Sequence, residues 1–337
     1  MESTMIQEHK KQYPMIDIVK FVCALLVVTL HIYPLSSYPG IFAQYINFGL
    51  QKCIARIAVP FYFTSAGFFL FQKIDIEKFD KSITKKYIIK LLCLLGIWRL
   101  LLFVGKTHHL WYMNALIVSV CIVNGLSPKK ISFRKLIVVA ILFYCIGLIG
   151  DSYYGLIRPL LDSSVIGYPI KVYNKIFGTT RNGFFMGFPF LLLGGIIAKK
   201  KIRIKPFYAF LGLLISMGML VFEALMLNKL KLAKDTNMYV SLIPTVYFLM
   251  LFSVNLKMKP KKIYVRIRHV GVVTYFSHFF IYQWLFGFRL IERITGFKIT
   301  NSLSIYFITI IFTLILEFCI ERLSEKRNLL FLRYLYS

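Results

Sequence analysis

Three ionisable side chains share one face of the first apolar segment. Asp17, Lys20 and His31 lie in the run IDIVKFVCALLVVTLHIYP. On an α-helix, Lys20 and His31 point within about 20° of each other and are separated by a rise of ~16 Å. An imidazole, whose ordinary pKa is ~6.5, both takes and gives a proton near neutral pH. We expect a polar stripe in which His31, Asp17 and Lys20 are catalytic. The alternative is that Asp17 and Lys20 form an interfacial ion pair and that His31 has a structural role.

Other polar side chains are expected at a similar depth. Charged groups inside apolar segments are costly and usually face a protein interior or a wet cavity. One arginine falls near the middle of the second segment, and one histidine in the middle of the ninth. The corner KTHHLWY precedes the fourth segment, where an interfacial aromatic belt is the alternative explanation for its Trp and Tyr. The predicted substrate-binding residues, around a cavity that opens outward, are Arg56, Arg99, His109, Trp111, Tyr112, Asp151, Arg181, Asn182 and His278.

The composition places these residues in a membrane protein. Apolar residues make up 58% of the 337 residues, against ~45–50% in soluble domains. We predict an all-α, polytopic integral membrane protein, a single domain over residues 1–337 with about ten transmembrane helices. Gly67 is expected to allow close helix approach, and 151–180 to be a loop along the membrane or over the cavity mouth. The predicted helices lie near 16–33, 47–71, 87–104, 110–126, 136–150, 181–198, 207–227, 238–256, 270–290 and 303–320.

The net charge of +28 is distributed unevenly along the chain. If the N-terminus is cytoplasmic, most Lys and Arg residues fall in inner loops and termini, such as the runs 199–203 and 257–268. Basic loops orient membrane proteins and also meet anionic lipid. The charge therefore predicts a multi-pass protein of the cell membrane, expected to be a bacterial plasma membrane, with both termini cytoplasmic. Its expected partner is the lipid bilayer and not nucleic acid.

The six cysteines indicate neither a disulfide framework nor a metal site. All of them fall within predicted helices, and none forms a CxxC pair or a ligand-like spacing with histidine. They are interpreted as small packing residues. No bound metal is expected.

Five ordered segments resemble the membrane acyltransferase family 3, and in particular the membrane half of the vancomycin-resistance serine racemases. The segments are the Ile16–Lys20 run with His31, Ala58–Phe68, His109–Tyr112, Gly150–Ile157 and Gly178–Gly183. The resemblance covers nearly the whole chain. It implies an O-acyltransferase of ten-helix type that acts on surface glycans or peptidoglycan.

The resemblance also implies roles for matching residues. His31 stands at the family's essential first-helix histidine, and Lys20 stands where the family usually has arginine. Lys85, Lys86 and Lys90 fall where many members carry an arginine motif associated with the acyl donor, so they are the expected donor-binding residues. Lysine keeps the charge but lacks the bidentate fork of arginine, which bears on how coenzyme A would be recognised. A racemase domain is not expected, since the sequence ends soon after the tenth predicted helix.

The expected activity is transfer of an acyl group, expected to be acetyl, from a cytoplasmic acyl-CoA co-substrate to a hydroxyl of an extracytoplasmic glycan. No tightly bound cofactor is expected. His31 would act as general base or acyl relay, while Arg56, Arg99 and Arg181 hold anionic groups or a developing oxyanion. The alternative is a carrier for a small amino acid such as serine, with Arg181 or Arg56 on the carboxylate and Asp151 on the ammonium. A sensor or assembly partner without turnover is a third possibility.

Overall fold

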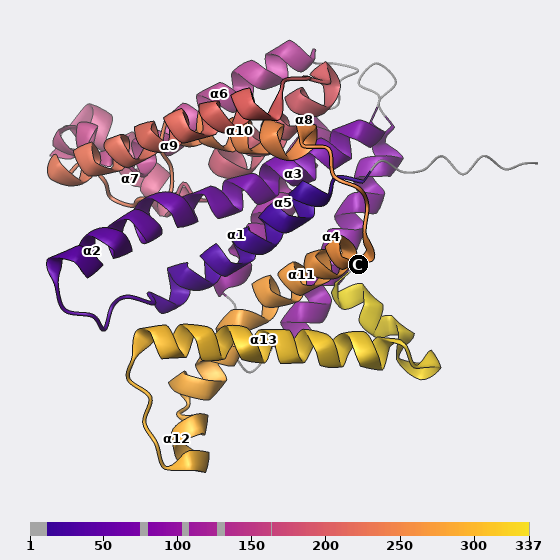
Figure 1. Cartoon of the computed structure of the whole chain (residues 1–337). Coiled ribbons are helices and arrows are strands. Elements are labelled where there is room, and N and C mark those ends of the chain that lie inside the picture. Colours follow the sequence, from indigo (N-terminus) through magenta and orange to yellow (C-terminus); the bar gives the residue numbers. More distant parts are fainter. Residues whose placement is uncertain (1–11, 75–79, 103–107, 127–131, 163, 337) are drawn as a thin grey trace, which may run out of the picture.

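The computed structural model describes residues 12–74, 80–102, 108–126, 132–162 and 164–336. Over these ranges the chain is predominantly helical and contains no β-strand. The main helix pairs are α3 with α8, α1 with α11, α9 with α10 and α11 with α13. In Figure 1, α1 and α3 run through the middle of the molecule, between α9 and α13.

The helices of the first half alternate with short π and 3₁₀ turns. They are α1 (Pro14–Ile32), α2 (Ile41–Phe48), η1 (Gly49–Cys53), η2 (Ile54–Ile57), α3 (Ala58–Lys73), α4 (Lys81–Leu101), η3 (His108–Leu110), α5 (Trp111–Gly125), α6 (Phe133–Gly150), η4 (Tyr154–Leu156) and η5 (Arg158–Asp162). The second half comprises α7 (Ser164–Phe177), η6 (Gly183–Gly187), α8 (Phe188–Lys200), α9 (Pro206–Lys229), α10 (Leu242–Asn255), α11 (Lys262–Tyr282), η7 (Gln283–Gly287), α12 (Leu290–Thr295), α13 (Ser302–Ser324) and η8 (Arg327–Leu335).

Every predicted helix coincides with helical structure, although several bounds differ. Within the described ranges, six helical stretches are long and apolar enough to cross a membrane: Pro14–Ile32, Ile41–Lys73, Phe133–Gly150, Gly183–Lys200, Pro206–Lys229 and Ser302–Ser324. Helices α5 and α10 are apolar but shorter, and α4 and α11 carry several basic residues in their first turns. The chain is thus a multi-pass helical membrane protein, while the count of about ten spans stays a prediction.

Two segments depart from the prediction. The region expected to be a loop, 151–180, contains the helix α7, whose apolar and polar residues gather on opposite faces, as in a helix lying against an apolar boundary. The second predicted helix begins earlier, at Ile41, and is broken by η1 and η2 before α3 begins. Ile41, Phe42 and Tyr45 of α2 are exposed, and α2 reaches beyond the neighbouring end of α1 (Figure 1).

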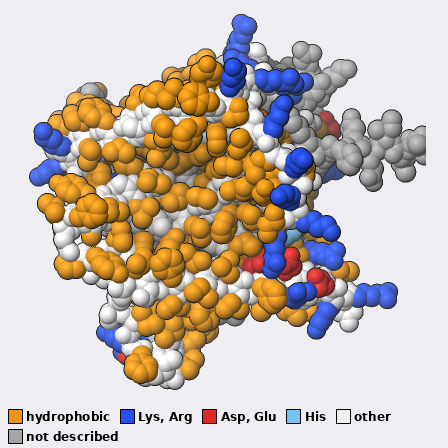
Figure 2. All heavy atoms as spheres, in the orientation of Figure 1, with side chains coloured by type: hydrophobic (Ala, Val, Ile, Leu, Met, Phe, Trp, Pro, Cys, Tyr) orange, Lys and Arg blue, Asp and Glu red, His pale blue; other side chains and the backbone are white. Residues whose placement is uncertain are grey.

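The surface separates apolar from basic side chains. Figure 2 shows hydrophobic side chains across the broad middle of the molecule and most visible Lys and Arg side chains along its right-hand edge, the end at which α13 finishes. Lys200, Lys201, Lys257 and Lys261 are all exposed. We call the end formed by these loops the basic end and the opposite end the far end. The predicted inner loop around Lys130 lies outside the described residues.

Close packing of α3 against α8 depends on glycines. A Cβ atom at Gly67 would lie 1.9 Å from the carbonyl oxygen of Leu191, and one at Gly194 would lie 1.9 Å from that of Thr64. Both neighbours are backbone atoms and cannot rotate away. The predicted close approach at Gly67 is therefore confirmed, and it occurs through the small-residue packing typical of membrane helices.

The first prediction concerns this contact. Gly194→Val should force α3 and α8 apart and destabilise the fold by ~3 kcal/mol or more, as overpacking of a tight core does. Gly218→Val is the matched control, because a Cβ there meets nothing within 4 Å. Thermal unfolding in detergent should show a lower melting temperature for the first variant only. Equal stability of the two variants would contradict the close packing.

Candidate functional site

Three histidines from distant parts of the chain meet at the far end. His31 lies in the last turn of α1, His109 in η3 and His278 near the end of α11. The centre of the His31 ring is 5.2 Å from that of His278 and 6.4 Å from that of His109. The ring centres of His109 and His278 are 5.3 Å apart. The ring of Phe279 packs against both His31 and His109. We call these three histidines the histidine cluster.

Backbone carbonyl groups orient two of the rings. His109 Nε2 lies 2.9 Å from the carbonyl oxygen of Phe276, and the hydroxyl of Tyr275 donates to the carbonyl of His109 at 2.8 Å. His278 Nδ1 lies 2.8 Å from the carbonyl oxygen of Tyr275. A carbonyl oxygen only accepts, so each of these ring nitrogens carries the proton. His109 and His278 are buried, whereas His31 is half-buried.

Two arginines approach the cluster and share one amide. Arg56 Nη1 donates to Asn237 Oδ1 at 2.6 Å, and Arg181 Nη1 donates to the same oxygen at 3.5 Å. The guanidinium of Arg181 also lies 4.7 Å from the centre of the Trp111 ring, a cation–π arrangement. Both charges act electrostatically on His31. The site therefore places two cations beside three imidazoles.

The break between α2 and α3 supplies a hydrogen-bond partner for Arg56. Arg56 Nε donates to the carbonyl of Gln51 at 2.9 Å. This carbonyl lies where η1 and η2 interrupt the regular α-helical hydrogen bonding. Arg181 Nε is buried and has no hydrogen-bond partner in the part of the chain that the structure describes. The guanidinium group of Arg181 thus forms fewer hydrogen bonds than that of Arg56.

Asp151 holds Asn237 in place. Its carboxylate accepts hydrogen bonds from the amide nitrogen of Asn237 at 2.8 Å, from Asn237 Nδ2 at 3.0 Å and from the amide of Met238 at 3.1 Å. Ser152 Oγ adds a further bond at 2.9 Å. Burial raises the pKa of this carboxyl, and these hydrogen bonds oppose that shift. Asp151 is therefore a support beneath the arginines, its oxygens already occupied.

Asn182 and Tyr112 also support the site through packing and capping. Asn182 Oδ1 accepts from the amides of Phe184 and Phe185, so it caps η6. Tyr112 is buried, with its ring 5.5 Å from that of Tyr62 and 5.7 Å from that of Tyr275. It lies in an aromatic layer that supports the cluster.

The remaining catalytic candidates, Asp17 and Lys20, lie toward the basic end. Lys20 Nζ sits 5.2 Å from the centre of the Phe69 ring, and the hydroxyl of Tyr62 donates to the Lys20 carbonyl at 2.8 Å. Asp17, Lys20 and Arg268 interact electrostatically, and in the described ranges Asp17 and Lys20 form no direct ion pair. The two ends of the predicted stripe thus have different polar surroundings.

The four remaining predicted site residues are exposed side chains of α4. Arg99 is exposed at the end of α4 and donates to the exposed Asn114 at 3.2 Å. Lys85, Lys86 and Lys90 are exposed side chains of the first half of α4.

Two buried polar residues were not predicted from the sequence. Asn237 falls at the edge of a predicted helix, and only its position after a basic loop distinguishes it. Glu317 is buried in α13, and its Oε1 has no hydrogen-bond partner within the described ranges. Glu317 could have been recognised from the sequence, because a carboxylate within an apolar helix is energetically unfavourable in a membrane and usually faces the protein interior.

The described residues contain no group of three or more His, Cys, Asp or Glu side chains that could hold a metal ion. All six cysteines are free. The interpretation as packing residues holds for the buried Cys23 and Cys53, whereas the other four are exposed.

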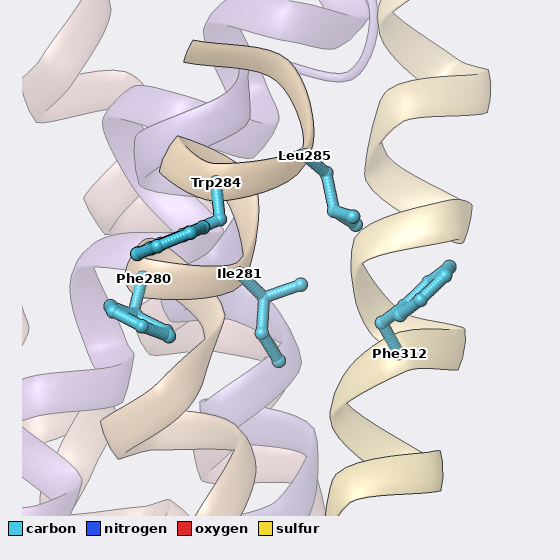
Figure 3. Close-up of a pocket in the computed structure, with 5 residues that line it drawn as sticks. All are labelled: Phe280, Ile281, Trp284, Leu285 and Phe312. Atoms are coloured by element: carbon cyan, nitrogen blue, oxygen red, sulfur yellow. The ribbon is translucent and has the colours of Figure 1, made fainter. Parts of the chain in front are cut away.

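An apolar groove of about 320 Å³ adjoins the far part of α11. Figure 3 shows its lining: Ile281 of α11 and Leu285 of η7 point toward Phe312 of α13, whereas the rings of Phe280 and Trp284 lie on the side away from it. The groove contains no group able to transfer a proton or hold a charge. The histidine cluster, by contrast, carries side chains that can transfer a proton.

Comparisons with known proteins agree with this picture. The sequence profile of an acyltransferase domain, acyltransferase family 3, matches residues 13–322. Two amino-acid racemases of Enterococcus faecalis are similar to the chain, at 33% identity over 71% of it and 28% over 73% of it. A serine/alanine racemase of Enterococcus gallinarum is 26% identical over 89% of the chain.

The chain spans 35%, 38% and 44% of the lengths of these three relatives. No solved structure matches it. Because the domain profile runs from the start of α1 almost to the end of α13, the chain belongs to the acyltransferase family 3.

Proposed function

We propose that the chain is a membrane O-acyltransferase. It transfers an acyl group, namely acetyl, from acyl-CoA in the cytoplasm to a hydroxyl of a cell-surface glycan outside the membrane. The observation that carries the proposal is the histidine cluster beside Arg56 and Arg181 at one end of α1, with Lys20 at the other. Imidazole and guanidinium are the groups that acyl transfer needs, a base for the hydroxyl and cations for the oxyanion.

The acceptor step takes place at His31. Its imidazole removes the proton as the acceptor oxygen attacks the thioester carbonyl, so an O–H bond breaks and a C–O bond forms. The tetrahedral intermediate then collapses, the C–S bond breaks, and the thiolate receives the proton. Arg56 and Arg181 stabilise the oxyanion, because both cations lie in a water-poor site where such interactions are strong.

The donor is held near the basic end. Lys20, supported by Asp17, lies on the same helix as His31, ~16 Å away along its axis. Lys85, Lys86 and Lys90 meet the phosphates of coenzyme A at the surface of α4. Because the C–S bond breaks only at His31, the thioester end of acyl-CoA extends along the α1 stripe to His31 while the phosphates stay at the basic end.

A second candidate function is a carrier for a small amino acid such as serine. It is favoured by the shared approach of Arg56 and Arg181 to Asn237, since two guanidinium groups can hold one carboxylate. The names of the relatives, amino-acid racemase and serine/alanine racemase, point to the same substrate class. The occupied carboxylate of Asp151 counts against its contact with an ammonium group.

One experiment separates the two functions. Purified protein in liposomes is supplied with acetyl-CoA and a soluble glycan acceptor, and parallel vesicles are supplied with labelled serine. Ester formation above that of empty liposomes, without serine uptake, is the expected result. Serine accumulation without ester formation would replace the acyltransferase by the carrier.

The orientation yields a further prediction. Both termini and the loops around Lys130, Lys200 and Lys261 should face the cytoplasm, because basic loops are retained there. Single cysteines at Ser37 and Asp235, in a background without native cysteines, should react with an impermeant reagent on whole cells. A cysteine at Lys200 should react only after the membrane is opened. The reverse pattern would invert the topology.

A further inference from the structure

His278 is held in a defined tautomer by its own helix. Its Nδ1 lies 2.8 Å from the carbonyl oxygen of Tyr275 and 3.0 Å from that of Thr274. Both partners can only accept, so Nδ1 carries the hydrogen of the neutral ring and Nε2 carries the lone pair. The helix thus determines which nitrogen is the base.

The nitrogen with the lone pair is buried and unpaired. His278 is fully buried, and its Nε2 has no hydrogen-bond partner in the residues that the structure describes. Buried polar atoms are almost always hydrogen-bonded, and a catalytic role is one of the explanations for an exception, beside strain and a bound water or ion. If His278 had only a packing role, the free-energy cost of burying Nε2 without a hydrogen bond would not be offset.

The ring of His278 also lies next to that of the proposed catalytic base, His31. The centroids of His278 and His31 are 5.2 Å apart, with an angle of 40° between the planes. Within the described residues Nε2 of His278 makes no hydrogen bond to His31, so proton transfer between the rings requires rotation of the His31 ring or a bridging water. The other groups near the pair are His109, 5.3 Å from His278, and Arg56 and Arg181, whose charges act on His31.

We infer that His278 is a second base of the site, which accepts through Nε2 the proton that would otherwise leave His31 as an isolated imidazolium. The inference rests on the proposed acyl transfer. Two arginines beside a half-buried imidazole oppose a further positive charge there. Both arginine charges act on His31, whereas the charges that act on His278 are those of His31 and His109, so passing the proton to α11 moves it away from the arginines at the cost of charging a fully buried ring.

Protons balance over one turnover of this relay. The acceptor hydroxyl gives its proton to one nitrogen of His31, and the proton on the other nitrogen of His31 passes to His278 Nε2. His278 is then doubly protonated and still donates from Nδ1 to the carbonyl of Tyr275. When the C–S bond breaks, His278 returns its proton through His31 to the thiolate, and both rings are again neutral.

The tautomer is tested without any acyl transfer. Solid-state NMR of the full chain in liposomes, with ¹⁵N-labelled histidine and His278→Asn to assign the signal, should show Nδ1 protonated and Nε2 bare near neutral pH. His31→Gln should shift the His278 Nε2 signal. A His278 protonated on Nε2, or one indifferent to His31→Gln, would overturn the inference whatever the chain's activity.

Kinetics test the role in the reaction. His278→Asn keeps an amide donor for the Tyr275 carbonyl but removes the base, so kcat should fall ~10²-fold with KM nearly unchanged. The rise of kcat with pH should move to lower pH, because one ring holds a proton less tightly than a coupled pair. His269→Gln is the matched control, since His269 lies toward the basic end and packs on Tyr336.

The outcomes are distinguishable. Full activity and an unchanged pH profile in His278→Asn would show that His278 has only a structural role, although the acyltransferase proposal would stand. Absence of ester formation by the wild-type chain would remove the proposed function. The NMR result would then still decide whether His278 and His31 are coupled.

Discussion

Replacing His31 by glutamine is expected to lower ester formation by at least ~10³-fold, the upper part of the range for loss of a general base. Glutamine keeps a polar group of similar reach but cannot take a proton from the acceptor hydroxyl. His31 contacts the rings of His109, His278 and Phe279, so the variant should still pack. Ester formation is measured in liposomes with acetyl-CoA and a glycan acceptor.

The control for this variant is its amount and orientation in the membrane. His31→Gln should accumulate and unfold like the wild type, since His31 is only half-buried. The double variant with His278→Asn should be little worse than His31→Gln alone, because residues acting in one proton relay are strongly non-additive. Activity of His31→Gln close to that of the wild type would show that His31 transfers no proton.

Much of the fold could be predicted because the bilayer imposes simple rules. Apolar length locates helices, and the period of the helix puts Lys20 and His31 on one face. Both rules act on residues near one another in sequence. They explain why each predicted helix was found, and why α7 was missed, since an amphipathic helix beside the membrane lacks a continuous apolar run.

These rules could not predict which side chains distant in sequence contact one another. His31 and His278 meet because α1 packs on α11, and hydropathy contains no information about which helices pair. Asp151 similarly finds Asn237 across 86 residues of sequence. The sequence indicates the depth of a polar residue and which residues share its helix face, but not whether that face meets another helix or the surface, and the predicted substrate-binding residue Arg99 is exposed.

Local breaks in helices were the other unpredictable feature. Arg56 is stabilised by the carbonyl of Gln51, which the π and 3₁₀ turns of η1 and η2 leave available. Pro60 follows this break by three residues, but a proline signals an interruption without giving its geometry, and the apolar run was predicted as one helix over 47–71. Such π-bulges are frequent at functional sites, and here one lies beside the proposed oxyanion-binding cation.

The lysines of α4 provide the sharpest distinction between the two candidate functions. Neutralising Lys85, Lys86 and Lys90 together, as glutamines, should lower kcat/KM for acetyl-CoA by ~10²-fold, because each charge-assisted contact to phosphate is worth up to about tenfold and salt screens exposed groups. A carrier of free serine has no phosphate to bind, so the same change should leave serine affinity nearly untouched. Acetyl-CoA titrations at low and high salt measure the effect.

Two controls make the result decisive. The lysines also contribute to the basic end, so the cysteine-labelling pattern must first show that the triple variant keeps its orientation. Arg181→Ala provides the opposite test, because it removes the guanidinium beside His31 that forms fewer hydrogen bonds, while leaving the surface of α4 intact. In a transferase, the triple variant should raise KM for acetyl-CoA, whereas Arg181→Ala should lower kcat through the lost oxyanion contact. A correctly oriented triple variant with full activity, together with complete loss in Arg181→Ala, would favour the amino-acid carrier, since only the carboxylate-binding cation would then be essential.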